Sequence, residues 1–330
     1  MKQNILFCII ALLSLFSCSE EQKDILMPNV SGSANEILLI LDDTRWEGAM
    51  GDTLYEVFGQ FMYGLPQEEP IFDIVQISPN TFSKMFETHR NIVRIKINRD
   101  VKKPLVEIKE NVWASPQLYI IIEASSDSMF YSLFSENKKA ITDLILAKER
   151  ERTVNYYKTY EDMQVVEYLK TKHQISLRIP KGYTVGREAD NFSWLSYEVG
   201  DAQIGVLVYE YPYIDDNTFT PDYLIAKRDS FVKLYVPGSV EGSYMTTEDT
   251  LYPVQFTEFM NKERYTVEMR GLWRMENDFM GGPFVSYTTL DEKNARIVTV
   301  EGFVYSPATD KRNFVRQLES VAYTLQFLEK

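Results

Sequence analysis

Aspartates that follow predicted strands are the residues of this chain best placed for acid–base chemistry. Asp42 and Asp43 end an apolar run that predicts a buried strand from Glu36 to Asp42. In α/β folds, ligands gather at the carboxyl ends of strands, and a carboxylate there can act as nucleophile or general base. Adjacent residues at a strand end point to opposite faces, so the two cannot share one catalytic role. Helix capping explains them better, with Thr44 as the cap and Glu47 reaching back to it.

Histidine chemistry is confined to His89 and His173. A zinc site would need both side chains or would depend on carboxylates. His89 stands beside Arg90 at the start of a predicted strand, which favours a structural role. The Asp215-Asp216-Asn217 run has oxygen ligands but lacks the spacing of an EF-hand, and Asp and Asn favour turns. We therefore expect no metal and no cofactor.

The best candidate for a binding site is a glycine-containing connection between two predicted strands. It carries two acids, an amide, two bulky apolar side chains and two glycines. Glycine permits a positive φ or the close approach of a partner's backbone. An ordinary hairpin connection is the alternative, and both interpretations stay open. The candidate residues are Glu276, Asn277, Asp278, Phe279, Met280, Gly281 and Gly282.

The first 17 residues predict a secretory signal peptide. Lys2 is the only charge before Glu20, and an apolar block leads to small residues that end at Cys18. The block is shorter than the ~20 residues of a bilayer span; an uncleaved membrane anchor is the alternative. Leu15-Phe16-Ser17-Cys18 resembles the bacterial lipobox, in which the cysteine is acylated. The resemblance implies contact with the membrane through acylated Cys18, and an outer-membrane lipoprotein on the periplasmic face or the cell surface.

The composition is acidic. The net charge is −13, and cleavage of residues 1–17 removes Lys2 and no acid, which gives −14. An acidic protein is a poor partner for nucleic acid, so we expect no nucleic-acid binding. The chain has two cysteines, Cys8 and Cys18. The first leaves with the signal peptide and the second is lipidated, so the mature protein has no disulfide.

Periodicity predicts two domains after a lipidated tether at residues 18–35. Residues 36–160 predict a mixed α/β layer, with strands alternating with amphipathic helices. The mixed charges of Glu149 to Arg152 indicate a solvated helix face. Residues 161–330 predict a mainly antiparallel sheet with two long helices, one beginning at Pro221 and one after Pro307. The fold class is therefore α+β, and the second domain is loosely similar to the Mog1/PsbP-type sandwich.

Several motifs of the second half resemble one family. They are Ile179-Pro180-Lys181-Gly182-Tyr183, Lys227-Arg228-Asp229-Ser230, Val236-Pro237-Gly238, Gly271-Leu272-Trp273-Arg274-Met275, Gly281-Gly282-Pro283-Phe284 and Glu301-Gly302-Phe303-Val304-Tyr305. Together with His89-Arg90-Asn91-Ile92 they resemble the Bacteroidetes lipoproteins catalogued as domain of unknown function 4837. The resemblance extends over nearly all of the mature chain. It implies a cell-envelope location and carries no activity, substrate or site.

Two functional hypotheses follow. The first is a lipid-anchored, non-catalytic binding or assembly module of the cell envelope, whose partner is an envelope protein or a glycan. The second is an envelope hydrolase whose acids come from separate strand ends, with Asp42, Asp43 and Asp278 as the first candidates. A cleft shared by these three side chains would favour the hydrolase.

Overall fold

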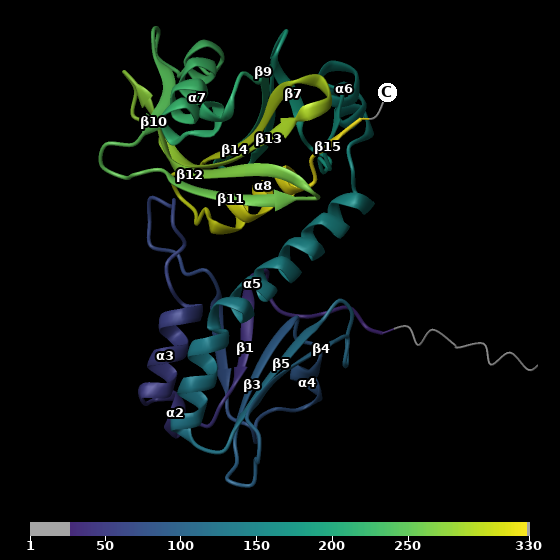
Figure 1. Ribbon diagram of the computed structural model, residues 1–330, viewed down its shortest axis with the longest axis vertical. Helices are drawn as coiled ribbons and strands as arrows, with labels where there is room; N and C mark the ends of the chain where they lie inside the picture. Colours follow the sequence, from purple (N-terminus) through teal and green to yellow (C-terminus); the bar gives the residue numbers. More distant parts are fainter. Residues whose placement is uncertain (1–26, 329–330) are drawn as a thin grey trace, which may run out of the picture.

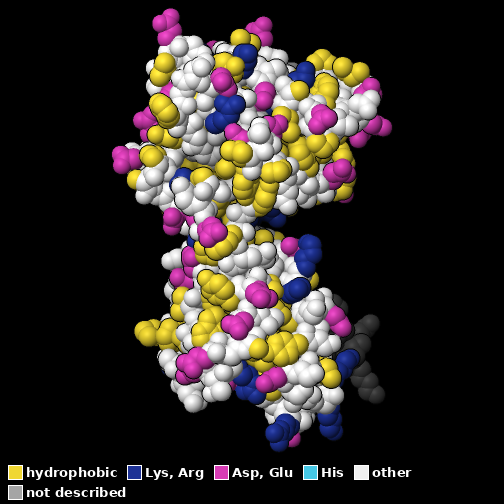
Figure 2. Space-filling view, turned by 90° about the vertical axis from the view of Figure 1, so that its left-hand side faces the viewer, with side chains coloured by type: hydrophobic (Ala, Val, Ile, Leu, Met, Phe, Trp, Pro, Cys, Tyr) yellow, Lys and Arg dark blue, Asp and Glu magenta, His cyan; other side chains and the backbone are white. Residues whose placement is uncertain are grey.

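The computed structural model describes residues 27–328, so Cys18 and the predicted signal peptide lie outside the described part of the chain. The chain forms two lobes, one around each sheet, and one long helix runs from the first lobe toward the second (Figure 1). Figure 2 shows the waist between the lobes and acidic side chains scattered over both.

The first lobe is built on a five-stranded sheet with the order β2-β1-β3-β5-β4. Its central strands are parallel, and only β4, at the edge, is antiparallel to its neighbour. The inner strands β1 and β5 are continuous apolar runs, as expected for strands covered on both faces. The bounds are β1 Glu36–Ile40, β2 Asp73–Ile77, β3 Asn91–Ile97, β4 Leu105–Glu110 and β5 Leu118–Ala124.

The helices of this lobe correct one prediction. The first begins at Asp42, whose Oδ1 accepts a hydrogen bond from the Arg45 amide at 3.1 Å, so Asp42 rather than Thr44 is the cap. Asp42 takes this role because its extended backbone lies directly before the first helical turn. Gly48 then separates α2 from α3. The bounds are α2 Asp43–Trp46, α3 Ala49–Phe58 and α4 Lys84–Glu87.

The longest helix, α5 (Asp127–Thr159), has 33 residues and begins at a Ser126 cap. Its first half packs Phe130, Phe134 and Ile141 into the core of the first lobe. Its second half carries Lys148, Glu149 and Arg152, which are buried. Within residues 27–328 no helix, α5 included, is long and apolar enough to cross a membrane.

The second lobe is an eight-stranded antiparallel sheet. Its order is β10-β12-β13-β14-β9-β8-β7, and β11 pairs with the same side of β12 as β10. The predicted α+β class is confirmed. The bounds are β7 Thr184–Ala189, β8 Phe192–Val199, β9 Ala202–Pro212, β10 Tyr244–Glu248, β11 Gln255–Asn261, β12 Arg264–Glu276, β13 Gly281–Asp291 and β14 Arg296–Tyr305. A separate pair joins β6 (Ile175–Ser176) to β15 (Gln326–Phe327).

Helices cover both faces of this sheet. On one face lies α7 (Pro221–Tyr235), which packs Phe231 against Tyr209 and Tyr211 of β9. On the other face lies α8 (Arg312–Tyr323), which contacts β13 and β14 as well as α5 of the first lobe. The short helix α6 (Met163–His173) follows α5, and the 3₁₀ turns are η1 Asp216–Phe219 and η2 Glu292–Asn294.

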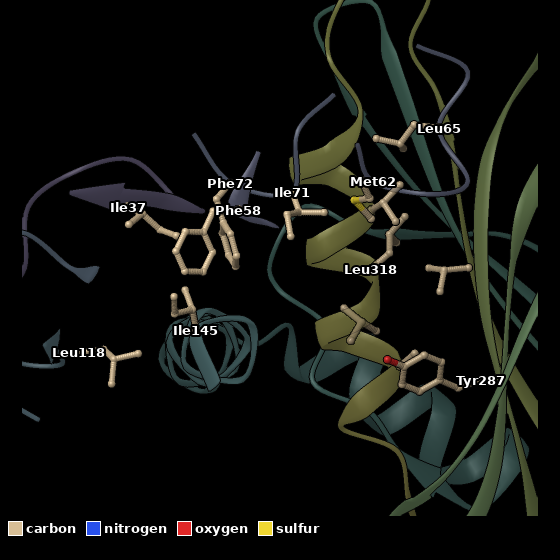
Figure 3. Packing of buried hydrophobic residues seen from close by; sticks show 14 of the residues in the cluster. Ile37, Phe58, Met62, Leu65, Ile71, Phe72, Leu118, Ile145, Tyr287 and Leu318 are labelled. Atoms are coloured by element: carbon tan, nitrogen blue, oxygen red, sulfur yellow. The ribbon is translucent and has the colours of Figure 1, made fainter. Parts of the chain in front are cut away.

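The two lobes share one hydrophobic core. Figure 3 shows Ile71 of the first lobe on one side of α8, and Met62 of the first lobe, Leu318 of α8 and Tyr287 of the second sheet on the other side. All four side chains are buried. Apolar contacts therefore continue from one sheet to the other through α8, which fixes the lobes as one packed unit.

Candidate functional site

The three aspartates of the hydrolase hypothesis do not meet. Asp42 bonds to Arg45, and Asp43 accepts a hydrogen bond from Gln76 Nε2 at 3.1 Å. Asp278 lies in the other lobe, in the turn between β12 and β13, where its Oδ2 accepts hydrogen bonds from Ser239. In Figure 1, α2 and the β10–α7 region lie at opposite ends of the molecule.

The ionisation of these acids also argues against acid–base chemistry. Burial would raise the pKa of Asp42, but hydrogen bonds from Arg45 outweigh it and lower that pKa. The hydrogen bonds from Ser239 and the Phe279 amide lower the pKa of Asp278. A general acid or base works best with a pKa near the operating pH. Both shifts move the pKa of these aspartates further below neutral pH.

Both histidines have structural partners. His89 Nε2 lies 2.7 Å from Glu36 Oε1, and its Nδ1 lies 3.1 Å from the Asn91 carbonyl oxygen. His173 is fully buried, between Glu210 Oε1 at 3.0 Å and Ser193 Oγ at 2.7 Å. Among residues 27–328, no three His, Cys, Asp or Glu side chains form a group that could hold a metal ion.

The predicted binding loop is a short turn between β12 and β13. Phe279 is fully exposed at its tip, and Asn277 has a φ of 63°. Gly282 is needed by the sheet itself, since a Cβ there would lie 2.0 Å from the Val304 carbonyl oxygen. Asp278 ties the turn to Ser239. Structural roles within the hairpin and its neighbouring turn thus account for Gly282 and Asp278. A binding role for Glu276–Gly282 stays a prediction.

A cavity of about 520 Å³ lies between the lobes, and we call it the interlobe cavity. This volume is within the ~300–1,000 Å³ range of small-molecule pockets. The second half of α5 forms one wall, α8 forms another, and the turn before β7 closes an end. Its lining residues are Ala34, Asn35, Arg90, Leu146, Glu149, Arg150, Arg152, Thr153, Tyr156, Tyr157, Tyr160, Pro180, Lys181, Tyr183, Tyr197, Asn313, Arg316, Gln317 and Ser320.

Two arginines on one carboxylate form part of the cavity wall. Arg90 binds both oxygens of Glu149, at 2.9 and 2.8 Å. Arg152 Nη1 lies 2.6 Å from Glu149 Oε1 and 2.9 Å from Asn91 Oδ1. Burial lowers the pKa of Arg152 to about 10. The charge of Glu149 raises this pKa, and the charge of Arg90 lowers it. At neutral pH the cluster therefore keeps one positive charge that no carboxylate of residues 27–328 balances.

Three further cations line the cavity. Arg150 stacks over the Tyr323 ring at 4.3 Å, and Lys181 is exposed at the turn before β7. Within the described part of the chain, neither has a carboxylate within 4.0 Å. Arg316 pairs with Glu319 at 3.0 Å. Glu319 also pairs with Arg270, and Arg270 pairs with Glu268. The two arginines and the two glutamates of this network therefore balance in charge. Arg150, Lys181 and the buried cluster thus leave three positive charges uncompensated.

Tyrosines supply the other part of the lining. Tyr156 in the last turn of α5 and Tyr160 directly after its end are half-exposed, with ring centroids 4.7 Å apart. Tyr183 and Tyr197 stack at 5.3 Å. Burial raises the pKa of Tyr157 and of Tyr183 well above the ordinary value, so both hydroxyl groups stay protonated at neutral pH. The cavity therefore presents aromatic faces together with neutral hydroxyl groups.

Two buried polar atoms of lining residues have no hydrogen-bond partner among the described residues. They are Asn35 Oδ1 and Arg316 Nε. Asn35 is buried and bonds to Asn313 Oδ1 through its other amide atom. Buried polar atoms are nearly always hydrogen-bonded, so this part of the wall is incomplete as a purely structural arrangement.

Sequence reasoning does not find this cavity. Its lining comes from six separated stretches of the chain, and no motif joins them. The sequence does contain one signal of the cavity, a run of charged residues, but the prediction made from it is wrong. The charged run from Glu149 to Arg152 predicts a solvated helix face, whereas Glu149 and Arg152 are buried against Arg90 and Asn91 at the start of β3. The helix is longer than the first sheet can cover, so its charged half packs at the waist.

Comparison with known proteins gives families without a known activity. Residues 162–324 match the model described as domain of unknown function (DUF4837), and residues 30–158 match the domain of unknown function (DUF8532). The first match is narrower than the resemblance predicted, because His89 to Ile92 lie in the part that matches the second family. No curated protein matches the chain in sequence.

Three solved structures are similar to about half of the chain. A mutant of the protein Mog1 has 10% identity and a TM-score of 0.30, and covers 48% of this chain and 92% of its own. The Ran-binding protein Mog1p of Saccharomyces cerevisiae has 8% identity and a TM-score of 0.31, with 47% and 91% covered. LpqN of Mycobacterium tuberculosis, involved in cell envelope biogenesis, has 9% identity and a TM-score of 0.28, with 47% and 83% covered.

These scores are too low for the likeness to say anything about function. The order of elements predicts a loose similarity to Mog1, and Mog1 structures are among those found, at TM-scores of 0.30 and 0.31. The family matches are more specific, since together they extend from residue 30 to residue 324. Through residues 162–324, the chain belongs to the family described as domain of unknown function (DUF4837).

Proposed function

We propose that this protein is a lipid-anchored, non-catalytic binding module of the cell envelope that holds a small molecule in the interlobe cavity. The observation that carries the proposal is the cavity itself. It is large enough for a small molecule, and it lies where ligand sites are common, at the junction of two folded units. The hydrolase alternative receives no support, because its aspartates lie in different lobes.

The wall of the cavity also favours binding over a purely structural gap. Arg90, Glu149 and Arg152 are held in place by bidentate and buried hydrogen bonds, so a ligand would meet a preformed surface at this cluster. A gap that served packing alone would be lined mainly by apolar side chains. Here five cations, five tyrosines and three amide side chains line the space.

Filling the cavity should abolish ligand retention. Ala34 is small, exposed and part of the lining, so we expect Ala34→Trp to occupy the space without disturbing the core. The purified mature chain is incubated with an envelope extract, washed and denatured, and the released small molecules are measured by mass spectrometry. We expect wild type to retain at least one compound that Ala34→Trp loses.

The neighbouring Ser33 provides the matched control. It is exposed and does not line the cavity, so Ser33→Trp adds the same side chain outside the site and should retain the compound. If wild type retains nothing, or if both variants lose it equally, the cavity is not the binding site.

The anchor is a second part of the proposal. It rests on the sequence around Cys18, which lies outside the described residues. In cells fed an alkyne-labelled fatty acid, we expect the label on wild type and on Cys8→Ala, whose altered residue leaves with the signal peptide. Cys18→Ala should carry no label. A labelled Cys18→Ala protein would refute acylation at this residue.

A further inference from the structure

The charge and polarity of the interlobe cavity restrict what it can bind. Three uncompensated positive charges face a small volume in a protein whose net charge is −13. Such a site favours an anion, because the field of fixed charges is strongest in a cleft with low-dielectric walls. Arginine and lysine both bind carboxylate and phosphate groups. The ligand should therefore carry an oxyanion.

An anion alone would leave most of the wall unused. The side chains of Asn35, Asn313 and Gln317 line the same space as the five tyrosines, and Asn35 Oδ1 has no hydrogen-bond donor among residues 27–328. An oxyanion cannot donate to an amide oxygen, whereas a hydroxyl group can donate and accept. The half-exposed rings of Tyr156 and Tyr160 add an apolar face for a ring. The ligand should therefore also carry several hydroxyl groups on a ring.

We infer that the interlobe cavity binds an acidic sugar, that is, a hydroxylated ring bearing a carboxylate or a phosphate. Lys181 and Arg150 would contact the anionic group, since neither is paired with a carboxylate in the described structure. The amides and tyrosine hydroxyl groups would bind the ring hydroxyl groups. This inference deepens the proposed function and rests on it.

Calorimetric titration of the full mature chain tests the inference with matched probes. The probes are glucuronate, glucose 1-phosphate, glucose and inorganic phosphate. We expect one or both acidic sugars to bind at least about 10-fold more tightly than glucose, since a hydrogen bond to a charged group contributes about 1.5–3 kcal/mol. Comparison of glucuronate with glucose 1-phosphate identifies the anionic group. Lys181→Gln and Arg150→Gln should each weaken that binding by about 10-fold or more.

Lys158→Gln is the matched control. Lys158 is an exposed cation on the same helix as Arg150 and does not line the cavity, so its loss should leave the affinity unchanged. The inference is overturned if neither acidic sugar binds, if glucose binds equally well, if inorganic phosphate binds as tightly as the sugar phosphate, or if Lys158→Gln has the same effect as Lys181→Gln. If the Ala34→Trp-sensitive compound proves neutral, the proposed function stands and only the acidic sugar is excluded.

Discussion

Arg228→Met should lower the free energy of unfolding by about 3–5 kcal/mol, the range for breaking a buried ion pair by removing one partner. Arg228 and Glu301 are both fully buried in the second lobe. Arg228 Nη2 lies 2.8 Å from Glu301 Oε1, and Nη1 donates to Thr247 Oγ1 at 2.8 Å. Methionine fills similar space but leaves the Glu301 carboxylate without a counter-charge. Urea unfolding followed by Trp fluorescence measures the loss.

Two controls separate the buried charge from other effects. Lys233→Met makes the same change on an exposed residue of α7 and removes a contact with the Tyr244 ring at 4.6 Å, so a loss of about 1 kcal/mol or less is expected. Adding Glu301→Gln to Arg228→Met removes the unpaired charge and should restore part of the stability. If the double variant is no more stable than Arg228→Met, the unpaired carboxylate is not the cause.

The stability that Arg228→Met loses relative to wild type should also become smaller as the pH falls. Burial raises the pKa of Glu301 above its ordinary value of 4.5, and Arg228 opposes the rise, so its removal raises that pKa further. A carboxyl group whose pKa is raised by folding destabilises the fold above the folded pKa. That cost is relieved as the pH falls through the folded pKa toward the ordinary value. The difference between wild type and Arg228→Met should therefore narrow from neutral pH downward. A pH-independent difference would contradict this account.

Glu69→Ala should lower the free energy of unfolding by about 2–6 kcal/mol. Glu69 is a buried residue of the first lobe whose two oxygens accept hydrogen bonds from the Lys311 and Arg312 amides, each at 2.8 Å. Lysine at the start of α8 makes no side-chain cap, so Glu69 caps this helix from the other lobe. Alanine would leave two buried N–H groups without acceptors, at about 1–3 kcal/mol each. Thermal or urea unfolding measures the effect.

The preceding residue is the natural control for this variant. Glu68 is exposed, so Glu68→Ala should change stability by about 0.5 kcal/mol or less. Equal losses in the two variants would show that Glu69 does not stabilise α8. The Arg312 side chain also joins α8 to the first lobe, because its Nη2 donates a hydrogen bond to Asp73 Oδ2 at 2.6 Å.

Local sequence patterns were sufficient for most elements of the fold. The long strand β12 alternates Val267, Met269 and Met275 on its buried face, and this period of two predicts a strand without knowledge of its neighbours. Pro221 marks the start of α7 for an equally local reason. The α+β class follows from such elements taken together.

Other elements depend on tertiary pairing and could not be predicted in this way. Strand β7 has almost no buried side chains, and β10 is a short edge strand held by β12. Neither has the apolar alternation that signals a strand. The interlobe cavity is harder still, because Arg90, Glu149 and Arg152 become one cluster only when α5 packs against β3. The spacing of these three residues along the sequence does not predict that they come into contact.

The position of α8 has a consequence for the order in which the molecule can form during synthesis. Met62 and Ile71 belong to the first quarter of the chain, yet they are covered by a helix that begins at Arg312. The first lobe therefore cannot finish folding until almost the whole polypeptide has been made. Until then, the first half of the chain keeps an uncovered apolar surface that a chaperone can bind.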